Sequence, residues 1–212
     1  MPRKNKRSAT IGTRPAALTQ SGNGNKNNQL RIIAGSWRGR KLPVADLPGL
    51  RPTSDRIRET VFNWLNMYVP GAHVLDCFSG SGALSLEALS RGAESAVLLE
   101  KAAPAAHILK QNLKTLKADH GKVVNTNSLE WLNRPADKAL DIIFLDPPFR
   151  TELLEQTCML LENNGYLHDN SLIYIEVEKE LSPLPVPAHW QPLKSKTGGQ
   201  VHFSLWTRST TE

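Results

Sequence analysis

The chain lacks three features that mark secreted and membrane proteins. It has only two cysteines, Cys77 and Cys158, which excludes a small secreted scaffold held together by disulfides. No apolar run approaches the roughly 20 residues that cross a bilayer, and the beginning of the chain has no apolar stretch like that of a signal peptide. The sequence therefore predicts a cytoplasmic protein without membrane contact, and we assign both cysteines to packing.

Acidic residues are scarce in the first part of the chain. Residues 1–58 hold 13 Lys and Arg but only two acids, Asp46 and Asp55, a net charge of +11, whereas residues 59–212 carry a net charge of −5. A basic segment on a mildly acidic body suggests a polyanionic partner. A basic tail that only keeps the protein in solution is the alternative.

The 212 residues favour one domain behind a tail, because a domain takes about 100–200 residues. Residues 1–28 have almost no large apolar side chains, so we predict that they form a disordered basic tail. A transit peptide is the second interpretation. Residues 29–212 form the predicted domain, which consists of an N-terminal hairpin and helix (29–70) and a sheet unit (71–212).

From His73 onward, short apolar runs alternate with helical patterns, which predicts an α/β fold with a mostly parallel sheet covered on both faces. We expect strands at 74–78, 95–100, 122–125, 141–145 and 171–177, and helices at 83–90, 104–116, 129–132 and 151–162. The last two runs, 191–196 and 200–206, are separated by Gly198 and Gly199. They predict an antiparallel hairpin at the sheet edge.

Before the sheet, the pattern predicts a small hairpin and one helix. The runs 30–34 and 37–42 surround a turn at Gly35-Ser36. The following helix is expected to begin at a cap formed by Thr53 or Ser54 and to be closed by Pro70-Gly71.

A glycine-rich loop, Asp76-Cys77-Phe78-Ser79-Gly80-Ser81-Gly82, separates the strand at 74–78 from the helix at 83–90. Its glycines let the backbone approach a ligand, and the helix N-terminus offers unpaired N–H donors to an anion. Glu100 ends the next strand, where an acid can accept hydrogen bonds from both ribose hydroxyls of an adenosine group.

Two cofactors compete for this loop. A dinucleotide fingerprint needs a third glycine where this chain has Ser85, and the Asp76 carboxylate suits a pyrophosphate badly. S-adenosyl-L-methionine instead brings an ammonium group that Asp76 suits. A tight strand-to-helix turn without a ligand is the remaining interpretation of the loop.

The motif Asp146-Pro147-Pro148-Phe149 directly follows the apolar strand at 141–145. Its prolines stiffen the segment and leave the Asp146 carboxylate and the Pro147 carbonyl as fixed acceptors. Two acceptors can hold an exocyclic amine of a nucleobase in line with a methyl sulfonium, and Phe149 can stack on the base. Alone, the motif also fits a strand-terminating turn. With the loop and Glu100 in the same sheet, it favours methylation of an amine over methylation of carbon, which needs a thiolate.

Together these motifs resemble a known family. The loop at 76–82 and the motif at 146–149 resemble the cofactor loop and the Asp/Asn-Pro-Pro-aromatic motif of class I amino methyltransferases. The segments Arg31-Ile32-Ile33-Ala34-Gly35, Trp37-Arg38-Gly39-Arg40 and Arg51-Pro52-Thr53-Ser54-Asp55-Arg56-Ile57-Arg58-Glu59 resemble the bacterial ribosomal small-subunit methyltransferase D family, and the likeness covers about 29–206. The resemblance implies a Rossmann-like sheet and methyl transfer from S-adenosyl-L-methionine to N2 of a guanine in 16S rRNA, within an assembling small ribosomal subunit.

The resemblance also implies site residues by position. Gly80 and Gly82 would approach the methionine part of the cofactor, Glu100 the ribose, and Asn127 with Ser128 the adenine edge, while the segment 51–59 closes the pocket. The implied cofactor-binding residues are Thr53, Asp76, Phe78, Gly80, Gly82, Glu100, Asn127 and Ser128. The implied catalytic residues are Asp146, Pro147, Pro148 and Phe149.

The basic N-terminal part of the domain is the predicted RNA-binding surface. The candidate residues are Arg31, Trp37, Arg38, Arg40, Lys41, Arg51 and Arg56. Arg58 has other possible roles, in a pair with Glu59 or against the core. The six histidines show no ligand spacing, so we expect no metal site.

Three alternative functions remain open from the sequence. The Pro-Pro motif also suits adenine-N6 methylation of DNA or RNA. A non-catalytic RNA-binding factor in ribosome assembly would keep the basic segment and only a vestigial pocket. An NAD-dependent oxidoreductase would use the glycine-rich loop for a dinucleotide.

Overall fold

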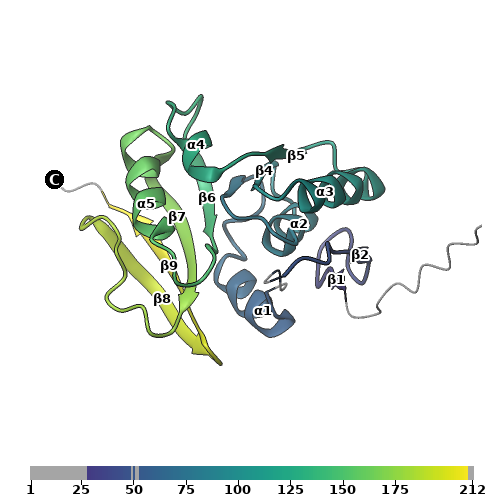
Figure 1. Cartoon of the computed structure of the whole chain (residues 1–212), viewed down its shortest axis with the longest axis horizontal. Coiled ribbons are helices and arrows are strands. Elements are labelled where there is room, and N and C mark those ends of the chain that lie inside the picture. The colour runs from purple at the N-terminus through teal and green to yellow at the C-terminus, as the bar shows by residue number, and fades with distance from the viewer. Residues whose placement is uncertain (1–27, 49, 51–52, 210–212) are drawn as a thin grey trace, which may run out of the picture.

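The computed structural model describes residues 28–48, 50 and 53–209. Apart from Asn28, the predicted tail at 1–28 lies outside these residues, as does Arg51. The described part forms a seven-stranded sheet with helices on both faces and a separate two-stranded hairpin (Figure 1). None of its helices is long and apolar enough to cross a membrane.

The large sheet has the strand order β5-β4-β3-β6-β7-β9-β8. Its parallel strands are β3 (His73–Asp76), β4 (Ser95–Glu100), β5 (Gly121–Asn125), β6 (Leu140–Leu145) and β7 (Leu167–Glu178). Strand β9 (Val201–Arg208) pairs antiparallel with β7, and β8 (Trp190–Gly198) lies at the edge beside β9. The predicted mostly parallel α/β sheet with a C-terminal antiparallel hairpin is therefore confirmed.

The strands are apolar on both faces because helices cover both. Side chains alternate between the faces of a strand, so Phe144 joins the core on one face and Leu145 the core on the other. Helices α1 (Asp55–Trp64), α2 (Ala83–Ser90) and α3 (Ala103–Leu116) pack on the Phe144 face. Helices α4 (Ser128–Leu132) and α5 (Leu153–Asn163) pack on the Leu145 face.

The chain changes direction within the sheet between β3 and β6. From β3 it proceeds to β4 and β5 on one side, then returns to β6 on the other side of β3 and continues to β7. Ligands of open α/β sheets bind beyond the carboxyl ends of the strands at such a switch point. Here the switch point places the glycine-rich loop after β3 next to the Asp-Pro-Pro-Phe motif after β6.

The predicted bounds of α2 and β4 are confirmed, whereas those of the N-terminal hairpin are wrong. The hairpin strands are β1 (Gln29–Arg31) and β2 (Lys41–Pro43), three residues each, instead of 30–34 and 37–42. The ladder stops early because the N–H groups of Ile33 and Ala34 donate to the carboxylate of Glu87 in α2 rather than to a partner strand.

Helix α1 also differs from the sequence prediction at its end. Its N-cap is Ser54, one of the two predicted candidates, whose side chain accepts from the N–H of Ile57. The helix ends at Trp64, ahead of the predicted stop at Pro70-Gly71, because the N–H groups of Tyr68 and Val69 close a turn on the Leu65 carbonyl.

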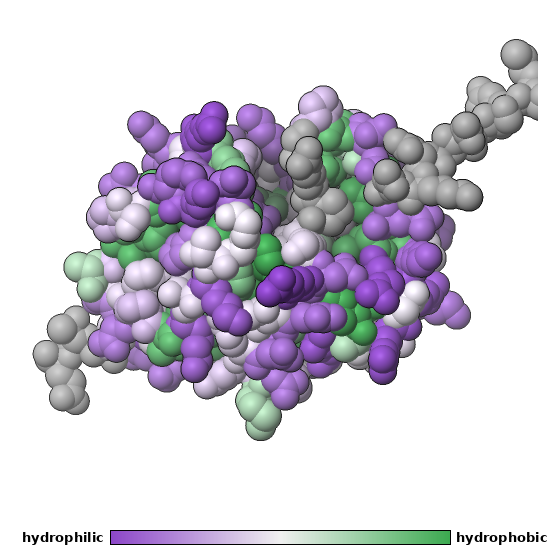
Figure 2. Space-filling view, turned by 90° about the horizontal axis from the view of Figure 1, so that it is seen from below, coloured by the Kyte–Doolittle hydropathy of each residue, from purple (hydrophilic) through white to green (hydrophobic). Residues whose placement is uncertain are grey.

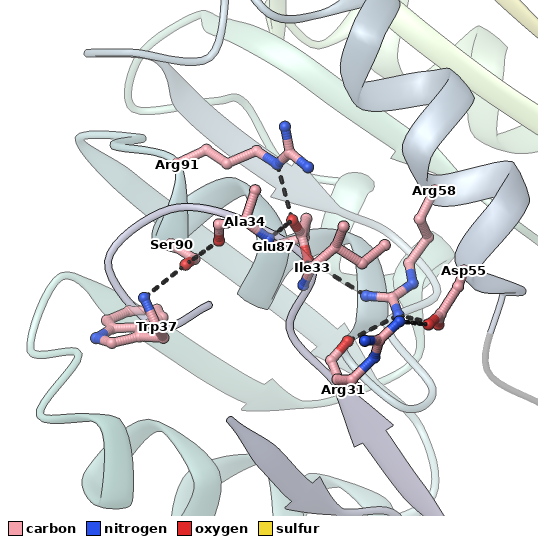
Figure 3. A network of polar contacts seen from close by, with 9 residues as sticks. All are labelled: Arg31, Ile33, Ala34, Trp37, Asp55, Arg58, Glu87, Ser90 and Arg91. Carbon is pink, nitrogen blue, oxygen red and sulfur yellow. Dashed lines mark hydrogen bonds and ion pairs between the residues drawn. The ribbon is translucent and has the colours of Figure 1, made fainter. Parts of the chain in front are cut away.

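A buried charge network fastens the N-terminal segment to α2 (Figure 3). Glu87 is fully buried and accepts from the N–H groups of Ile33 and Ala34 at 2.8 and 2.9 Å. It also pairs with Arg58 of α1 at 3.3 Å and with Arg91 at 2.8 Å. One carboxylate therefore holds the hairpin connection, α1 and the end of α2 together.

Arg58 is the second centre of this network, and of its two alternative roles, a pair with Glu59 or a position against the core, the structure shows the second. Its guanidinium is buried and donates to Asp55 at 2.6 Å, to the Arg31 carbonyl at 2.8 Å and to Glu87. A buried ion pair contributes little net stability, but removal of one partner leaves an uncompensated buried charge.

We expect Glu87→Ala to lower the free energy of unfolding by about 3–5 kcal/mol, because Arg58 would lose its buried partner and the N–H groups of Ile33 and Ala34 their acceptor. Urea denaturation followed by circular dichroism measures this, with Glu94→Ala at an exposed position as the control. Glu87→Gln should give an intermediate loss, since the amide oxygen still accepts. A loss below about 1 kcal/mol in Glu87→Ala would contradict the anchoring role.

Candidate active site

Three carboxylates lie at the carboxyl ends of three neighbouring strands. Asp76 is the last residue of β3, Asp146 directly follows β6, and Glu176 lies near the end of β7. The register pairs Leu145 with Ile175, so the next residues along the two strands, Asp146 and Glu176, lie side by side. The charges of Asp76 and Glu176 both act on Asp146.

Asp76 is buried and fixed by two donors. The Ser85 hydroxyl donates to its carboxylate at 2.6 Å and the Phe78 N–H at 3.3 Å. Burial raises the pKa of Asp76 to about 7, the charge of Glu100 contributes in the same direction, and the two hydrogen bonds oppose them. A carboxylate with this pKa gains its charge near neutral pH, as binding groups in active sites often do.

The Asp-Pro-Pro-Phe motif has free hydrogen-bond acceptors and an exposed aromatic ring. Asp146 is half-buried, and its carboxylate and the Pro147 carbonyl accept no hydrogen bond from the described residues. The Pro148 carbonyl is used by the Thr151 hydroxyl at 2.7 Å, which shapes the turn. Phe149 is 44% exposed, so a flat ring can reach its face.

Glu176 is a site residue that the sequence interpretation missed. It is buried and accepts from the Tyr174 hydroxyl at 2.7 Å. Burial raises its pKa despite this hydrogen bond, and burial together with the charges of Glu176 and Asp76 raises the pKa of Asp146 well above its ordinary value. The available signal was position, because Glu176 stands at the end of its strand as Asp146 does at the end of β6.

The three carboxylates have no basic partner among the described residues. None of the ion pairs there includes Asp76, Asp146 or Glu176. Crowded acids in a dry site favour protonation or a bound cation. No group of His, Cys, Asp and Glu in this part of the chain has the arrangement of a metal site.

The two glycines of the loop are required by the packing of the chain itself. Gly80 and Gly82 have φ of +50° and +75°, which side chains rarely adopt. A Cβ at Gly80 would lie 2.8 Å from the Leu50 side chain, and one at Gly82 would lie 2.5 Å from that of Leu109. Leu50 therefore covers the loop from the N-terminal side, and Thr53, close by in sequence, is buried too.

Glu100 is engaged by the backbone but retains acceptor capacity. Its two oxygens accept from the N–H groups of Gly80 at 2.8 Å and Ala102 at 2.6 Å. A carboxylate offers about four acceptor positions, so two remain for hydroxyl donors.

Both predicted adenine-edge residues, Asn127 and Ser128, make hydrogen bonds within the protein at the turn before α4. The Asn127 side chain accepts from the Leu129 N–H at 2.9 Å as the N-cap of α4. The Ser128 hydroxyl donates to the Cys77 carbonyl, which ties this turn to the glycine-rich loop. Both turns therefore lie at the same end of the sheet.

The predicted RNA-binding residues that the structure describes lie on the N-terminal hairpin, where Arg31 pairs with Lys41, and on α1. The backbone N–H of Trp37 donates to the Ser90 hydroxyl at the end of α2. The Trp37 ring lies 6.1 Å from that of His120, just before β5. Arg40 donates to the Thr115 carbonyl near the end of α3. Helices α2 and α3 begin at the carboxyl ends of strands and run back along the sheet. Trp37 and Arg40, near the last turns of these helices, therefore lie at the opposite end of the strands from Asp146.

The remaining basic residues divide into paired and unpaired ones. Arg31 pairs with Asp55 at 2.8 Å, whereas Arg38 and Lys41 are exposed without a described partner. Arg56, on α1, lines a groove together with the β8–β9 turn. Both cysteines are fully buried and free, in agreement with a packing role.

Comparisons with known proteins cover the whole described domain. Residues 30–207 match the family model described as Conserved hypothetical protein 95. The chain is 52% identical to Ribosomal RNA small subunit methyltransferase D of Escherichia coli (strain K12) over 182 residues, 86% of this chain and 91% of that protein. A relative of the same name from Haemophilus influenzae is 48% identical over 185 residues, 86% of this chain and 95% of that protein. The solved structure of yhhF from Escherichia coli has a TM-score of 0.79 at 51% identity, and the match covers 86% of this chain and 99% of that chain.

We expect the free protein to lose stability as the pH rises from about 4 to about 7, because folded Asp76 keeps its proton in this window and unfolded Asp76 does not. In Asp76→Asn, the free energy of unfolding should fall by a few kcal/mol less over the same pH range. Urea denaturation at intervals across the window measures it.

Asp141→Asn is the matched control. Burial favours a higher pKa for Asp141, but hydrogen bonds from the His73 N–H and the His168 ring lower it below its ordinary value. Asp141 therefore gains its charge below about pH 4, so its removal should leave the slope between about pH 4 and 7 nearly unchanged. Equal slopes in the wild type and Asp76→Asn would contradict the prediction.

Proposed function

Because this chain belongs to the ribosomal RNA small subunit methyltransferase D family, we propose that it transfers a methyl group from S-adenosyl-L-methionine to N2 of a guanine in 16S rRNA of an assembling small ribosomal subunit. The family relation rests on 52% identity over 86% of the chain. Those relatives are small-subunit rRNA methyltransferases by name, and the same substrate class is proposed for this chain.

The observation that carries the proposal is the group of three unpaired carboxylates beside the glycine-rich loop. S-adenosyl-L-methionine is an organic cation with a sulfonium and an ammonium group, and it supplies a methyl group activated by the positive sulfur. Asp76 and the loop that Leu50 covers fit its amino-acid part, and Glu100 has acceptor positions left for ribose hydroxyls. A dinucleotide, with its anionic pyrophosphate, fits these charges badly.

The Asp-Pro-Pro-Phe motif supplies what the acceptor amine requires. The free Asp146 carboxylate and Pro147 carbonyl accept both N–H groups of the amine and fix its orientation, while the exposed Phe149 ring stacks on the base. Glu176 lies beside Asp146 and is held by Tyr174. Its charge adds to the negative potential that favours the positive nitrogen formed during transfer.

We expect Asp146→Ala to lower kcat by about 10²–10³-fold, because one of the two acceptors that orient the amine is lost. Affinity for S-adenosyl-L-methionine should change little, and Asp146→Asn should keep part of the activity. The assay follows tritium transfer to small subunits from cells that lack this protein, with calorimetry for the cofactor.

Nucleoside analysis of the methylated product tests the chemistry itself. N2-methylguanosine is the expected product. Detection of N6-methyladenosine instead would show that the target is the adenine amine and not the guanine amine. Unchanged activity in Asp146→Ala would contradict the role of the motif. Absence of any transfer by the wild type, together with tight RNA binding, would favour a non-catalytic assembly factor.

Cofactor affinity should rise by up to about tenfold between pH 6 and pH 8, because the pKa of Asp76 is about 7 and only its ionised form attracts a cation. Calorimetry in buffers of different ionisation enthalpy should detect proton release on binding near pH 7. Asp76→Asn should flatten the profile. S-adenosylhomocysteine, which lacks the sulfonium charge, should show a weaker pH dependence, and a flat wild-type profile would contradict the assignment.

A further inference from the structure

A groove separates α1 from the turn that joins β8 to β9. Its volume is about 500 Å³, and its lining combines hydroxyl-bearing and basic side chains with apolar ones and two glycines. The lining residues are Ser54, Arg56, Ile57, Thr60, Lys196, Thr197, Gly198, Gly199 and Phe203. In Figure 1, α1 and this turn lie together at the bottom, so they face the viewer of Figure 2, where hydrophilic residues dominate the surface.

The groove lies at the same end of the sheet as the candidate active site, level with the carboxyl end of β7. Strand β9 begins opposite the end of β7, since Glu178 pairs with Val201, and Gly198 pairs with the same Val201 from β8. In the register, Glu176 pairs with Phe203 and Phe203 with Lys196. Lys196 is thus three strand spacings from the position of Asp146, roughly 14 Å.

Two basic side chains, Arg56 and Lys196, give the groove its positive charge. Among the described residues, neither Arg56 nor Lys196 makes an ion pair or a side-chain hydrogen bond. On the same helix, Asp55 faces Arg31 and Arg58, and Glu59 also acts on Arg31, so the acids of α1 serve its other side. Arg56, Ile57 and Thr60 form the face toward the turn.

The floor of the groove allows close approach of a ligand. Gly198 and Gly199 carry no side chain, and an added Cβ at Gly199 would meet nothing within 4 Å. Ser54 and Thr197 line the rim with the two cations, whereas the Thr60 hydroxyl already donates to the Arg56 carbonyl. Cations with hydroxyl and backbone donors are the groups that contact nucleic-acid phosphates.

We propose that this groove binds the RNA backbone next to the target nucleotide, with Arg56 and Lys196 on its phosphates. The inference rests on the proposed function and adds the β8–β9 turn to the RNA-contacting surface. It also gives the substrate a direction, from the Phe149 ring across the ends of β7 and β9 to the groove. Trp37 and Arg40 lie at the opposite end of the sheet, and their contact with RNA stays a prediction.

Salt-dependent binding of 16S rRNA and of small subunits tests the groove. The double substitution Arg56→Ala with Lys196→Ala should weaken binding by about tenfold and reduce the slope of log K against log salt by about 1.4–1.8, because two phosphate contacts are lost. The control is Lys110→Ala with Lys122→Ala, exposed residues on α3 and on β5 at the other end of the sheet. It removes the same charge and should change neither value beyond error.

Photo-crosslinking identifies the occupant directly. Lys196→Cys can be labelled selectively with a photoreactive group, because Cys77 and Cys158 are fully buried. Crosslinks should fall on rRNA nucleotides close to the methylated one. Crosslinks to ribosomal proteins alone, or to rRNA far from that nucleotide, would overturn the proposal.

The outcomes separate this inference from the function on which it rests. If the wild type binds S-adenosyl-L-methionine and methylates small subunits, but the groove variant keeps the wild-type affinity and salt slope, only the groove assignment fails. If the wild type does neither, the proposed function fails first. Unchanged cofactor affinity in the groove variant shows that the fold and the cofactor pocket are intact.

Discussion

The architecture depends on one buried carboxylate. Glu87 accepts hydrogen bonds from the connection between β1 and β2 and pairs with Arg58 of α1, so two segments that precede the sheet are fixed to α2. Between them in the chain, Leu50 lies against Gly80 of the glycine-rich loop. A methyltransferase sheet alone would leave this loop open, and the Glu87 network supplies its cover.

A second constraint is the crowding of like charges where the chain changes direction in the sheet. Asp76, Asp146 and Glu176 follow three adjacent strands, and burial raises the pKa of each. Such an arrangement costs folding free energy, which a cationic ligand recovers on binding. In the proposed function, the same feature favours a sulfonium cofactor and accommodates the positive charge that develops on a methylated amine.

The candidate surfaces for the polyanionic substrate were only partly predictable. Charge counting located an excess of Lys and Arg in residues 1–58, yet it could not separate Arg58, which is buried, from Arg56, which lines the groove. These residues are two positions apart on one helix and therefore face different directions. Lys196, more than a hundred residues away in sequence, joins Arg56 only because β8 returns to the same sheet edge.

By itself the sequence determined the α/β class, the bounds of α2 and β4, and the two motifs after β3 and β6, because periodicity and local motifs are encoded by neighbouring residues. Tertiary structure decided which polar groups meet. The hairpin strands shortened because Ile33 and Ala34 found a partner in Glu87. Glu176 joined the site through strand register, and Arg56 met Lys196 through sheet order. These pairings involve residues far apart in the chain, and local patterns carry no information about their distances.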